Sequence, residues 1–503
     1  MKSVPQPINS DTDTLKQLGY TQELDRRMSG FSNFAISFSI ICILSGGLTS
    51  FHLGFSAVGG AAIGIGWPIG CTLALVVAAT MGQLASAFPT AGGLYHWAAI
   101  LGGRCWGWIT AWFNLAGLIA ALAAINVGTF LFAVNSIGKI FGINWENLPS
   151  NQQFLMQACG VTLITVSQGI INHRGIKLTT LLTDFSGYLI LAVSFLLTAT
   201  MLICTSNYDF TRLITFTNYS GIKGGDVWPL SNHLGILFAL GLLLPAYTIT
   251  GFDASAHTSE ETLAAQTTVP LGIIRSVLIS GLAGWLMLAA MILAMPSLDQ
   301  AASQGPNVFF WLLDSVAPKA VSGLLLSGII LAQYLCGLAT VTSASRMTYA
   351  FARDGGLPFS KQLKKINSEN LTPSASIWTI VALSCLFTFY TPVYSTISVV
   401  CVIFLYISYV IPAGLGFFAH GRAWHNFGPW NLGIWFKPAC VISVLGGSLL
   451  ILIGVQPPND KALIVLGGTA IAMTVIWFGL ERKRFIGPPP GVMNHLKIHL
   501  GRK

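Results

Sequence analysis

Apolar runs long enough to cross a membrane recur along almost the whole chain of 503 residues. A transmembrane helix needs about 20 predominantly apolar residues. Twelve runs meet this length, and they begin near Asn33, Ala61, Cys105, Phe154, Ile176, His233, Leu271, Val321, Ser374, Tyr394, Pro438 and Ala462. The runs lack the polar–apolar alternation of a membrane β-barrel. We therefore predict an all-α membrane protein with 12 transmembrane helices.

Two of the runs are interrupted by helix-breaking residues at similar depth. Span 1 carries Gly46-Gly47 in its middle, and span 6 carries Pro245 and Gly251. An unwound turn frees backbone N–H and C=O groups that a small polar ligand can satisfy, although each glycine could equally serve close helix packing. The breaks lie about 205 residues and five spans apart, which favours two inverted copies of five spans around a binding site.

The composition supports membrane insertion. Hydrophobic residues make up 53% of the chain and charged residues 9%, whereas a soluble domain carries about 25% charged residues. These values exclude a soluble globular protein and also a disordered one. The net charge of +9 therefore does not indicate nucleic-acid binding, and we expect the lipid bilayer as the main partner.

Positive charge is unevenly distributed between the two sides of the predicted bundle. With the N-terminus in the cytosol, 21 of the 26 Lys and Arg residues fall in inner segments and 5 in outer loops. Cytosolic segments are enriched in Lys and Arg, so we predict that both termini are cytosolic, in a plasma membrane or a bacterial inner membrane. We expect a cytosolic tail over 1–30, one twelve-span domain over 31–481 and a basic tail over 482–503.

The sequence carries no signature of an enzyme or of a metal site. The nine Cys residues lie mostly inside apolar runs without CxxC spacing, so we expect no structural disulfide or zinc ion. HExxH, GxSxG and phosphate-cradling GxxxxGK[ST] motifs are also absent from the sequence. We therefore expect no catalytic residues, no enzyme activity and no bound cofactor.

Acidic residues inside the spans are the first candidates for function. Of the 17 acidic residues, only Asp184 and Asp253 fall well inside predicted spans, where a carboxylate is costly. Asp253, at the span-6 break, could bind a substrate amine or a proton, or it could cap the inner half-helix. His257 follows one turn later and could relay a proton with it or contact a neighbouring helix. Asp184 is a candidate coupling site or a structural partner for a basic residue.

Other polar residues are candidates for gating and binding. Glu260 and Glu261, near the inner end of span 6, could form an inner gate with Arg275 or Arg346, or they could remain solvated. Asn114 in span 3 is a candidate substrate contact, although such a side chain can equally form an interhelical hydrogen bond.

Three segments together resemble a known family of transporters. They read ASAFPTAGGLYHW (85–97), GFDASAHTSEET (251–262) and SRMTYAFARDGGLP (345–358). Over residues 18–481 the chain resembles the amino acid–polyamine–organocation superfamily, closest to the amino acid/choline branch with its GABA and choline permeases. The resemblance implies a leucine-transporter-like 5+5 inverted repeat with broken helices 1 and 6, plus two extra helices, and alternating access around a central site.

The resemblance also implies which residues contact the substrate. By motif position, the residues facing the substrate carboxylate are Ser45, Gly46, Gly47, Leu48 and Thr49. The residues lining the amine side are Thr250, Gly251, Phe252 and Asp253. Arg346 would belong to the cytosolic end of span 8.

The sequence leaves the coupling ion open between a proton and sodium. Ile190 stands where some proton-coupled relatives carry a lysine, and Gln83 stands where many relatives carry a glutamate. Thr342, Ser343 and Ser345 could supply oxygens to a sodium ion, or their hydroxyls could satisfy their own helix.

We expect a secondary active transporter, either a permease or an exchanger, for amino acids or related small amines such as GABA. The alternatives are a choline- or polyamine-type organocation permease and a transport-inactive nutrient sensor of the same fold. A small amino acid or amine is the expected ligand, and no nucleic acid is expected to bind.

Overall fold

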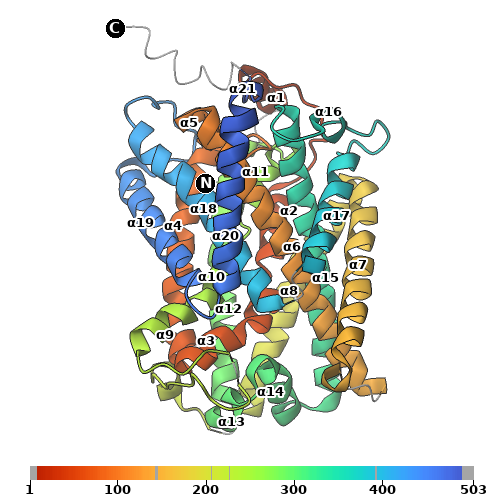
Figure 1. The fold of residues 1–503 in the computed structure, drawn as a ribbon, viewed down its shortest axis with the longest axis vertical. Helices are drawn as coiled ribbons and strands as arrows, with labels where there is room; N and C mark the ends of the chain where they lie inside the picture. The colour runs from red at the N-terminus through yellow and green to blue at the C-terminus, as the bar shows by residue number, and fades with distance from the viewer. Residues whose placement is uncertain (1–7, 142–144, 206, 226, 391–392, 490–503) are drawn as a thin grey trace.

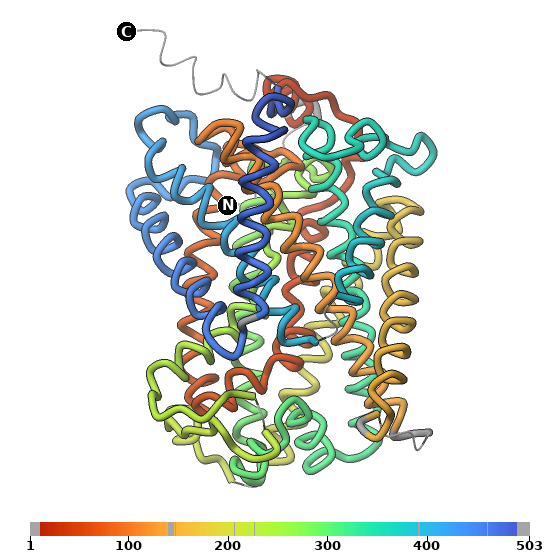
Figure 2. The backbone as a smooth tube through the Cα atoms, in the orientation of Figure 1, coloured from red at the N-terminus to blue at the C-terminus, as the bar shows by residue number. Residues whose placement is uncertain are grey.

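The computed structural model describes residues 8–489 apart from 142–144, 206, 226 and 391–392, and this part of the chain is almost entirely helical. Within it, strand pairing is limited to two isolated bridges, Met28 with Thr262 and His420 with Trp424. The long helices run side by side along one axis, and shorter segments cover both ends of the bundle (Figures 1 and 2).

The longer helices are α2 (Gly30–Ile41), α4 (Trp67–Ala87), α6 (Arg104–Phe141), α7 (Ser150–His173), α8 (Ile176–Cys204), α12 (Ala265–Ala294), α15 (Lys319–Arg353), α17 (Ser374–Tyr390), α18 (Tyr394–Ala419), α19 (Phe436–Gly454) and α20 (Asp460–Ile476). The shorter ones are α1 (Ile8–Gln17), α3 (Phe51–Val58), α5 (Leu94–Gly102), α9 (Leu234–Gly241), α10 (Leu243–Thr248), α11 (Ala254–His257), α13 (Leu298–Ala302), α14 (Val308–Val316), α16 (Ser360–Leu363) and α21 (Arg482–Arg484). Three π-helical turns, η1 (Ile43–Gly47), η2 (Ala62–Gly66) and η8 (Trp477–Glu481), adjoin them.

Ten helical segments among the described residues are long and apolar enough to cross a membrane. Two shorter apolar segments, Leu234–Thr248 and Ser374–Tyr390, lie where the sixth and ninth spans are predicted. Burial separates inner from outer helices: 89% of the apolar window of α2 and η1 is buried, against 11% in the window that contains α20. Large apolar side chains such as Phe195, 76% exposed, point outward, as expected of a surface that faces lipid. The predicted all-α membrane class is confirmed.

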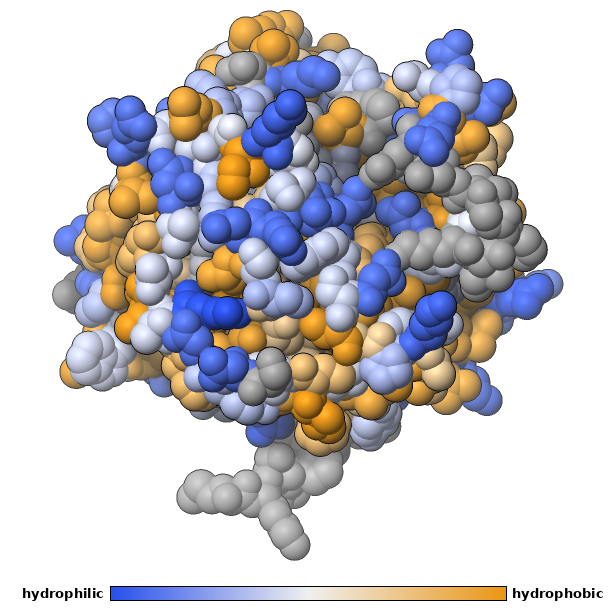
Figure 3. Space-filling model, turned by 90° about the horizontal axis from the view of Figure 1, so that it is seen from below, coloured by the Kyte–Doolittle hydropathy of each residue, from blue (hydrophilic) through white to orange (hydrophobic). Residues whose placement is uncertain are grey.

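The two ends of the bundle differ in construction. The termini end, uppermost in Figure 1, carries α1, α5, α16 and α21, and the opposite end carries α3, α9, α13 and α14. Figure 3 views the opposite end and shows polar residues across its middle with hydrophobic residues around the rim. Residues 20–28 belong to the segment expected as a tail and lie against the termini end, where the Met28 N–H donates to the Glu261 carbonyl (2.8 Å).

Both predicted helix interruptions are present. After α2, Cys42 leaves helical geometry at φ 11° and ψ 89°, and residues 43–47 form the wide turn η1 before α3 begins at Phe51. After α10, residues 249–253 are non-helical until α11 begins at Ala254. The first interruption thus begins at Cys42, four residues before the Gly46-Gly47 pair that predicted it.

The two interrupted segments cross at very short range. A Cβ atom added to Gly46 would lie 2.9 Å from the Thr248 Cα atom, so only glycine lets the two backbones approach this closely. Gly251 combines a positive φ of 88° with a contact in which an added Cβ would lie 2.4 Å from Cγ2 of Ile40. Close packing and unwinding, the two alternatives for these glycines, therefore occur together.

The crossing yields a prediction for two adjacent glycines. We expect Gly46→Ala to lower the free energy of unfolding by about 1–3 kcal/mol, because its new methyl group meets backbone that cannot yield. Gly47→Ala is the matched control, since its Cβ would lie 3.7 Å from the Met287 methyl group, an ordinary contact. Thermal unfolding in detergent measures both, and equal effects would contradict the crossing.

Candidate functional site

A small inner cavity lies beside the crossing of the two interrupted segments. Its free volume is about 20 Å³, enough for roughly one water molecule. Its walls come from the α2–η1 segment, α6, α10 with its unwound extension, and α18. The lining residues are Ile40, Ile41, Ser45, Gly46, Leu118, Ala121, Ile125, Tyr247, Thr248, Thr250, Gly251, Cys401 and Leu405. A mostly apolar wall with a few polar groups is typical of a small-molecule site.

The polar groups at this cavity differ in their availability to a ligand. The Thr248 hydroxyl donates to the Leu244 carbonyl (2.8 Å), and the Thr250 hydroxyl donates to the Ala246 carbonyl (2.6 Å). In the described part of the chain, the Ser45 hydroxyl has no hydrogen-bond partner.

The unwound backbone beside the cavity also has free donors. Among the described residues, the N–H groups of Thr250, Phe252 and Asp253 have no hydrogen-bond acceptor. Such groups need a partner inside a membrane, and an anionic or polar group of a ligand can provide it.

Asp253 lies beside the cavity without lining it, and both of its oxygens accept hydrogen bonds. The Tyr409 hydroxyl donates to Oδ1 (2.8 Å), Nδ2 of Asn114 donates to Oδ2 (2.8 Å), and Nε2 of His257 lies 3.2 Å from Oδ2. The Asp253 side chain makes no capping hydrogen bond to α11. Asn114 therefore contacts Asp253 through an interhelical hydrogen bond, while contact of either residue with a substrate stays a prediction.

A larger outer cavity of about 620 Å³ opens toward the opposite end. Tyr394 separates it from the inner cavity: its hydroxyl lies 2.5 Å from Oγ1 of Thr49 and 3.1 Å from Oγ of Ser50. Its ring also meets the ring of Tyr247 edge-on at 5.9 Å. Thr49 and Tyr394 line the outer cavity and Tyr247 lines the inner one, so this layer forms a thin lid between the two.

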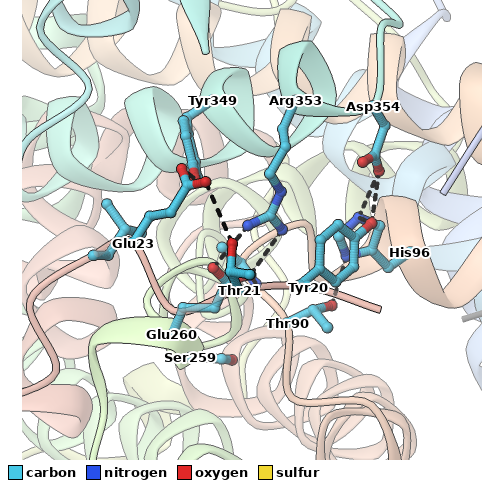
Figure 4. A network of polar contacts seen from close by, with 12 residues as sticks. Tyr20, Thr21, Glu23, Thr90, His96, Ser259, Glu260, Tyr349, Arg353 and Asp354 are labelled. Carbon is cyan, nitrogen blue, oxygen red and sulfur yellow. Dashed lines mark hydrogen bonds and ion pairs between the residues drawn. The ribbon is translucent and has the colours of Figure 1, made fainter. Parts of the chain in front are cut away.

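The termini end is closed by a buried polar network, drawn in Figure 4. Asp354 accepts a hydrogen bond from the Tyr20 hydroxyl (2.8 Å) and lies 3.0 Å from Nε2 of His96. Arg353 forms two hydrogen bonds to Glu260 (2.9 and 3.0 Å), and its guanidinium lies 3.9 Å from the centre of the Tyr20 ring. Burial alone raises the pKa of the Asp354 carboxyl, but the hydrogen bonds and the charges of His96 and Arg353 hold it below its ordinary value.

A second ion pair reinforces this closure. Arg346 donates from Nε and Nη2 to both oxygens of Glu261 (3.0 and 2.9 Å), and both side chains are fully buried. Arg26 ties the N-terminal segment to the same place by donating to the carbonyls of Ser259 and Thr262. Of the alternatives for Glu260 and Glu261, the structure therefore has the ion-paired one: Glu261 pairs with Arg346 as predicted, whereas Glu260 pairs with Arg353 and not with Arg275.

The remaining predicted residues lie away from the inner cavity. Gly47 and Leu48 are buried in the core, and Phe252 packs on the Tyr409 ring at 5.1 Å. Asp184 is partly buried in α8 and accepts a hydrogen bond from the Ser32 hydroxyl (3.0 Å).

Two of the three hydroxyls proposed as sodium ligands are hydrogen-bonded within the protein. The Thr342 hydroxyl donates to Oδ1 of Asn172 (2.7 Å), and the Ser345 hydroxyl donates to the Thr342 carbonyl (2.9 Å). Ser343 is buried, and its hydroxyl has no partner in the described part of the chain. Two of the three side chains thus follow the alternative in which the hydroxyls satisfy protein groups.

Sequence reasoning missed three tyrosines and one histidine of this site: Tyr394, Tyr409, Tyr20 and His96. Tyr394 and Tyr409 both lie on α18, and a hydroxyl-bearing aromatic residue inside an apolar run is a usable signal. Tyr20 and His96 offered no comparable signal, because their partner Asp354 lies 334 and 258 residues away in sequence.

Comparison with known proteins identifies the class of this molecule. Residues 28–480 match the family model described as amino acid permease, so the chain belongs to the amino acid permease family. It is 31% identical to the amino-acid permease BAT1 of Arabidopsis thaliana, over 97% of this chain and 98% of that protein. It is 30% identical to the BAT1 homolog of Oryza sativa subsp. japonica (94% of each chain) and 29% identical to the GABA-specific permease of Saccharomyces cerevisiae (73% of this chain, 64% of that protein).

These matches confirm the resemblance to the amino acid–polyamine–organocation superfamily and the expectation of a transporter rather than an enzyme. The relatives are named as permeases, and the helices that carry the cavities belong to a multi-pass membrane protein.

The buried ion pair at the termini end yields a stability prediction. We expect Arg346→Met to lower the free energy of unfolding by about 3–5 kcal/mol, because Glu261 is left charged and unpaired in a buried place. Arg484→Met is the control: its pair with Glu481 is 40% exposed on the arginine side, and exposed pairs contribute about 0–1 kcal/mol. Thermal unfolding in detergent compares the two, and a smaller effect for Arg346→Met would refute a buried pair.

Proposed function

We propose that this protein is a secondary active transporter that moves amino acids across the membrane by alternating access. Its twelve spans would form a leucine-transporter-like 5+5 inverted repeat with two extra helices, with both termini in the cytosol. The observation that carries the proposal is the inner cavity held between two interrupted helices, with a tyrosine lid on one side and buried ion pairs on the other.

The chemistry of the inner cavity supports a substrate with a carboxylate. The Ser45 hydroxyl and the free N–H group of Thr250, both at the cavity wall, are donors that suit a carboxylate oxygen. Apolar side chains such as Leu118 and Leu405 cover the remainder of the wall and suit the carbon atoms of a small amino acid. Choline and polyamines lack the carboxylate that these donors would bind, so amino acids are the favoured class.

The two ends of the bundle support alternating access. The opposite end has a cavity of about 620 Å³ that reaches down to Tyr394, while the termini end is sealed by the Glu260–Arg353 and Glu261–Arg346 pairs. Transport would require the lid to move so that the inner cavity expands around a substrate. The termini-end pairs would then separate while the outer cavity closes.

GABA is one of the first substrates to test. The yeast relative is named a GABA-specific permease, and GABA has a carboxylate and an amine like an α-amino acid. The distance between the carboxylate and the amine differs between GABA and an α-amino acid. Comparing the uptake of the two would therefore report the spacing of the groups that bind them in the site. A nutrient sensor of the same fold would bind these compounds without moving them.

Reconstitution tests the proposed activity directly. Proteoliposomes containing the purified chain should take up at least one labelled amino acid from a panel of α-amino acids and GABA, with saturation and with competition by the unlabelled compound. Choline and putrescine complete the panel. Binding without uptake would favour the sensor, and uptake of choline or putrescine alone would favour the organocation permease.

The free Ser45 hydroxyl yields a prediction about affinity. We expect Ser45→Ala to raise the KM for the transported amino acid by about 2- to 12-fold, the effect of losing one hydrogen bond of about 0.5–1.5 kcal/mol. Thr248→Val is the matched control, because its hydroxyl also lies at the cavity but is bound to the Leu244 carbonyl. A larger KM effect from the threonine variant would exclude Ser45 as a ligand.

A further inference from the structure

The contacts of His257 fix where its protons can be. Nδ1 of His257 lies 3.1 Å from the Ala91 carbonyl oxygen, which only accepts, so this nitrogen carries a hydrogen atom. Nε2 lies 3.2 Å from Oδ2 of Asp253. One further proton is therefore shared by the two groups: it sits on Nε2 beside a carboxylate, or on the carboxyl group, which then donates to Nε2.

Within the part of the chain that the structure describes, no neighbouring group supplies a hydrogen atom or a positive charge that could take the place of this proton between Asp253 and His257. The Tyr409 hydroxyl accepts the Gly251 N–H (3.2 Å) and gives its own hydrogen to Asp253. Asn114 contributes an amide, and the nearby Cys401 contributes a thiol to the cavity wall. Among the described residues, no Lys or Arg forms an ion pair with Asp253. Loss of the shared proton would leave a buried carboxylate facing an imidazole lone pair, a costly arrangement in a medium of low dielectric.

The pair lies between the inner cavity and the closed termini end. On the cavity side, Gly251 lines the cavity and is linked to Asp253 through Tyr409. On the other side, the Ala91 carbonyl contacts His257 while the Ala91 N–H donates to Oε1 of Glu260 (3.1 Å). Glu260 in turn pairs with Arg353, whose guanidinium covers Tyr20.

The loop that contacts His257 is shaped to receive its ring. A Cβ atom added to Gly93 would lie 3.3 Å from the His257 ring, and Gly93 has a positive φ of 47°. Contacts thus lead from the cavity wall, through the pair and the backbone of one residue, Ala91, to the ion pair that closes the termini end. A change in the charge of the pair is therefore felt by both the cavity and the gate.

We propose that the Asp253–His257 pair is the proton-binding site of the transporter, taking up one proton from the outer side and releasing it at the termini end in each cycle. The proposal rests on the proposed transport function and adds its coupling ion. The proton moves from water to the pair and from the pair to water, and no other bond forms or breaks. With the pair protonated, its net charge is zero, which suits its buried place while the gate is closed. When the gate opens, water reaches the pair and accepts the proton.

The test uses proteoliposomes of the full chain, with the membrane potential clamped at zero and an amino acid that the wild-type protein transports. An inward gradient of one pH unit should drive about tenfold accumulation if one proton accompanies each substrate, and an internal pH dye should report the proton entering. Asp253→Asn and His257→Gln should still exchange internal for external amino acid but lose both gradient-driven accumulation and proton entry. His233→Gln changes an exposed histidine directly before α9, a helix of the opposite end, and this variant should behave like the wild type.

Other outcomes would overturn the proposal in distinguishable ways. Wild-type uptake that ignores the pH gradient, or variants that keep gradient-driven accumulation, would exclude this pair as the coupling site while leaving the transport function intact. Loss of substrate binding at every pH in Asp253→Asn, with His257→Gln unaffected, would assign Asp253 to the substrate amine. No saturable uptake by the wild type would instead refute the proposed function itself.

Tyr409→Phe is a milder variant for the case in which neither the Asp253→Asn nor the His257→Gln protein folds. Tyr409→Phe keeps the ring that packs on Phe252 and removes one hydrogen-bond donor from Asp253. Because the deprotonated carboxylate is then less stabilised, the midpoint of the uptake–pH profile should move to higher pH. An unmoved midpoint in a folded Tyr409→Phe protein would contradict proton binding at Asp253.

Discussion

The close crossing of the two interrupted helices is the contact on which the remainder of the structure depends. At Gly46 and Thr248 the backbones approach so closely that a single added methyl group would collide with a Cα atom. Two continuous helices with ordinary side chains pack 8–10 Å apart, which would leave no place for backbone donors beside a common cavity. The crossing brings the unwound turns of both segments to the same wall, and it thereby creates the cavity and leaves donors there unpaired.

The pairing of buried acidic residues in this protein follows from the free-energy cost of burying an isolated charge in a membrane. Asp253, Glu260 and Glu261 are fully buried, and each one has a partner within 3.2 Å: His257, Arg353 and Arg346. While the termini end is closed, each arginine and its glutamate compensate each other's charge without water. The two pairs would separate if this end opened. In the proposed transport cycle, opening of this end would require substrate binding to offset the free energy of these contacts.

Much of the fold follows from the sequence alone. The length of the apolar runs predicts the helices, and the structure places ten long apolar segments and two shorter ones at the expected positions. Gly46 and Gly251 marked the two interruptions because glycine weakens a helix interior and the two breaks lie five spans apart. The extent of the first interruption was not predictable: it begins at Cys42, an ordinary apolar position whose backbone is displaced by the wide turn that follows it.

In the candidate site, too, some features follow from the sequence and others only from the tertiary structure. Sequence alone determined that Asp253 and His257 lie one turn apart, because this pairing is local and depends only on helical periodicity. Scarcity of charge also singled out Asp253, since few carboxylates fall within apolar runs. Tertiary structure alone decided that Tyr409 and Asn114 hold its oxygens, that Tyr394 covers the cavity, and that Tyr20 reaches Asp354. Those contacts join residues between 139 and 345 positions apart, and no pattern within one helix encodes which distant side chain will face it after the helices pack.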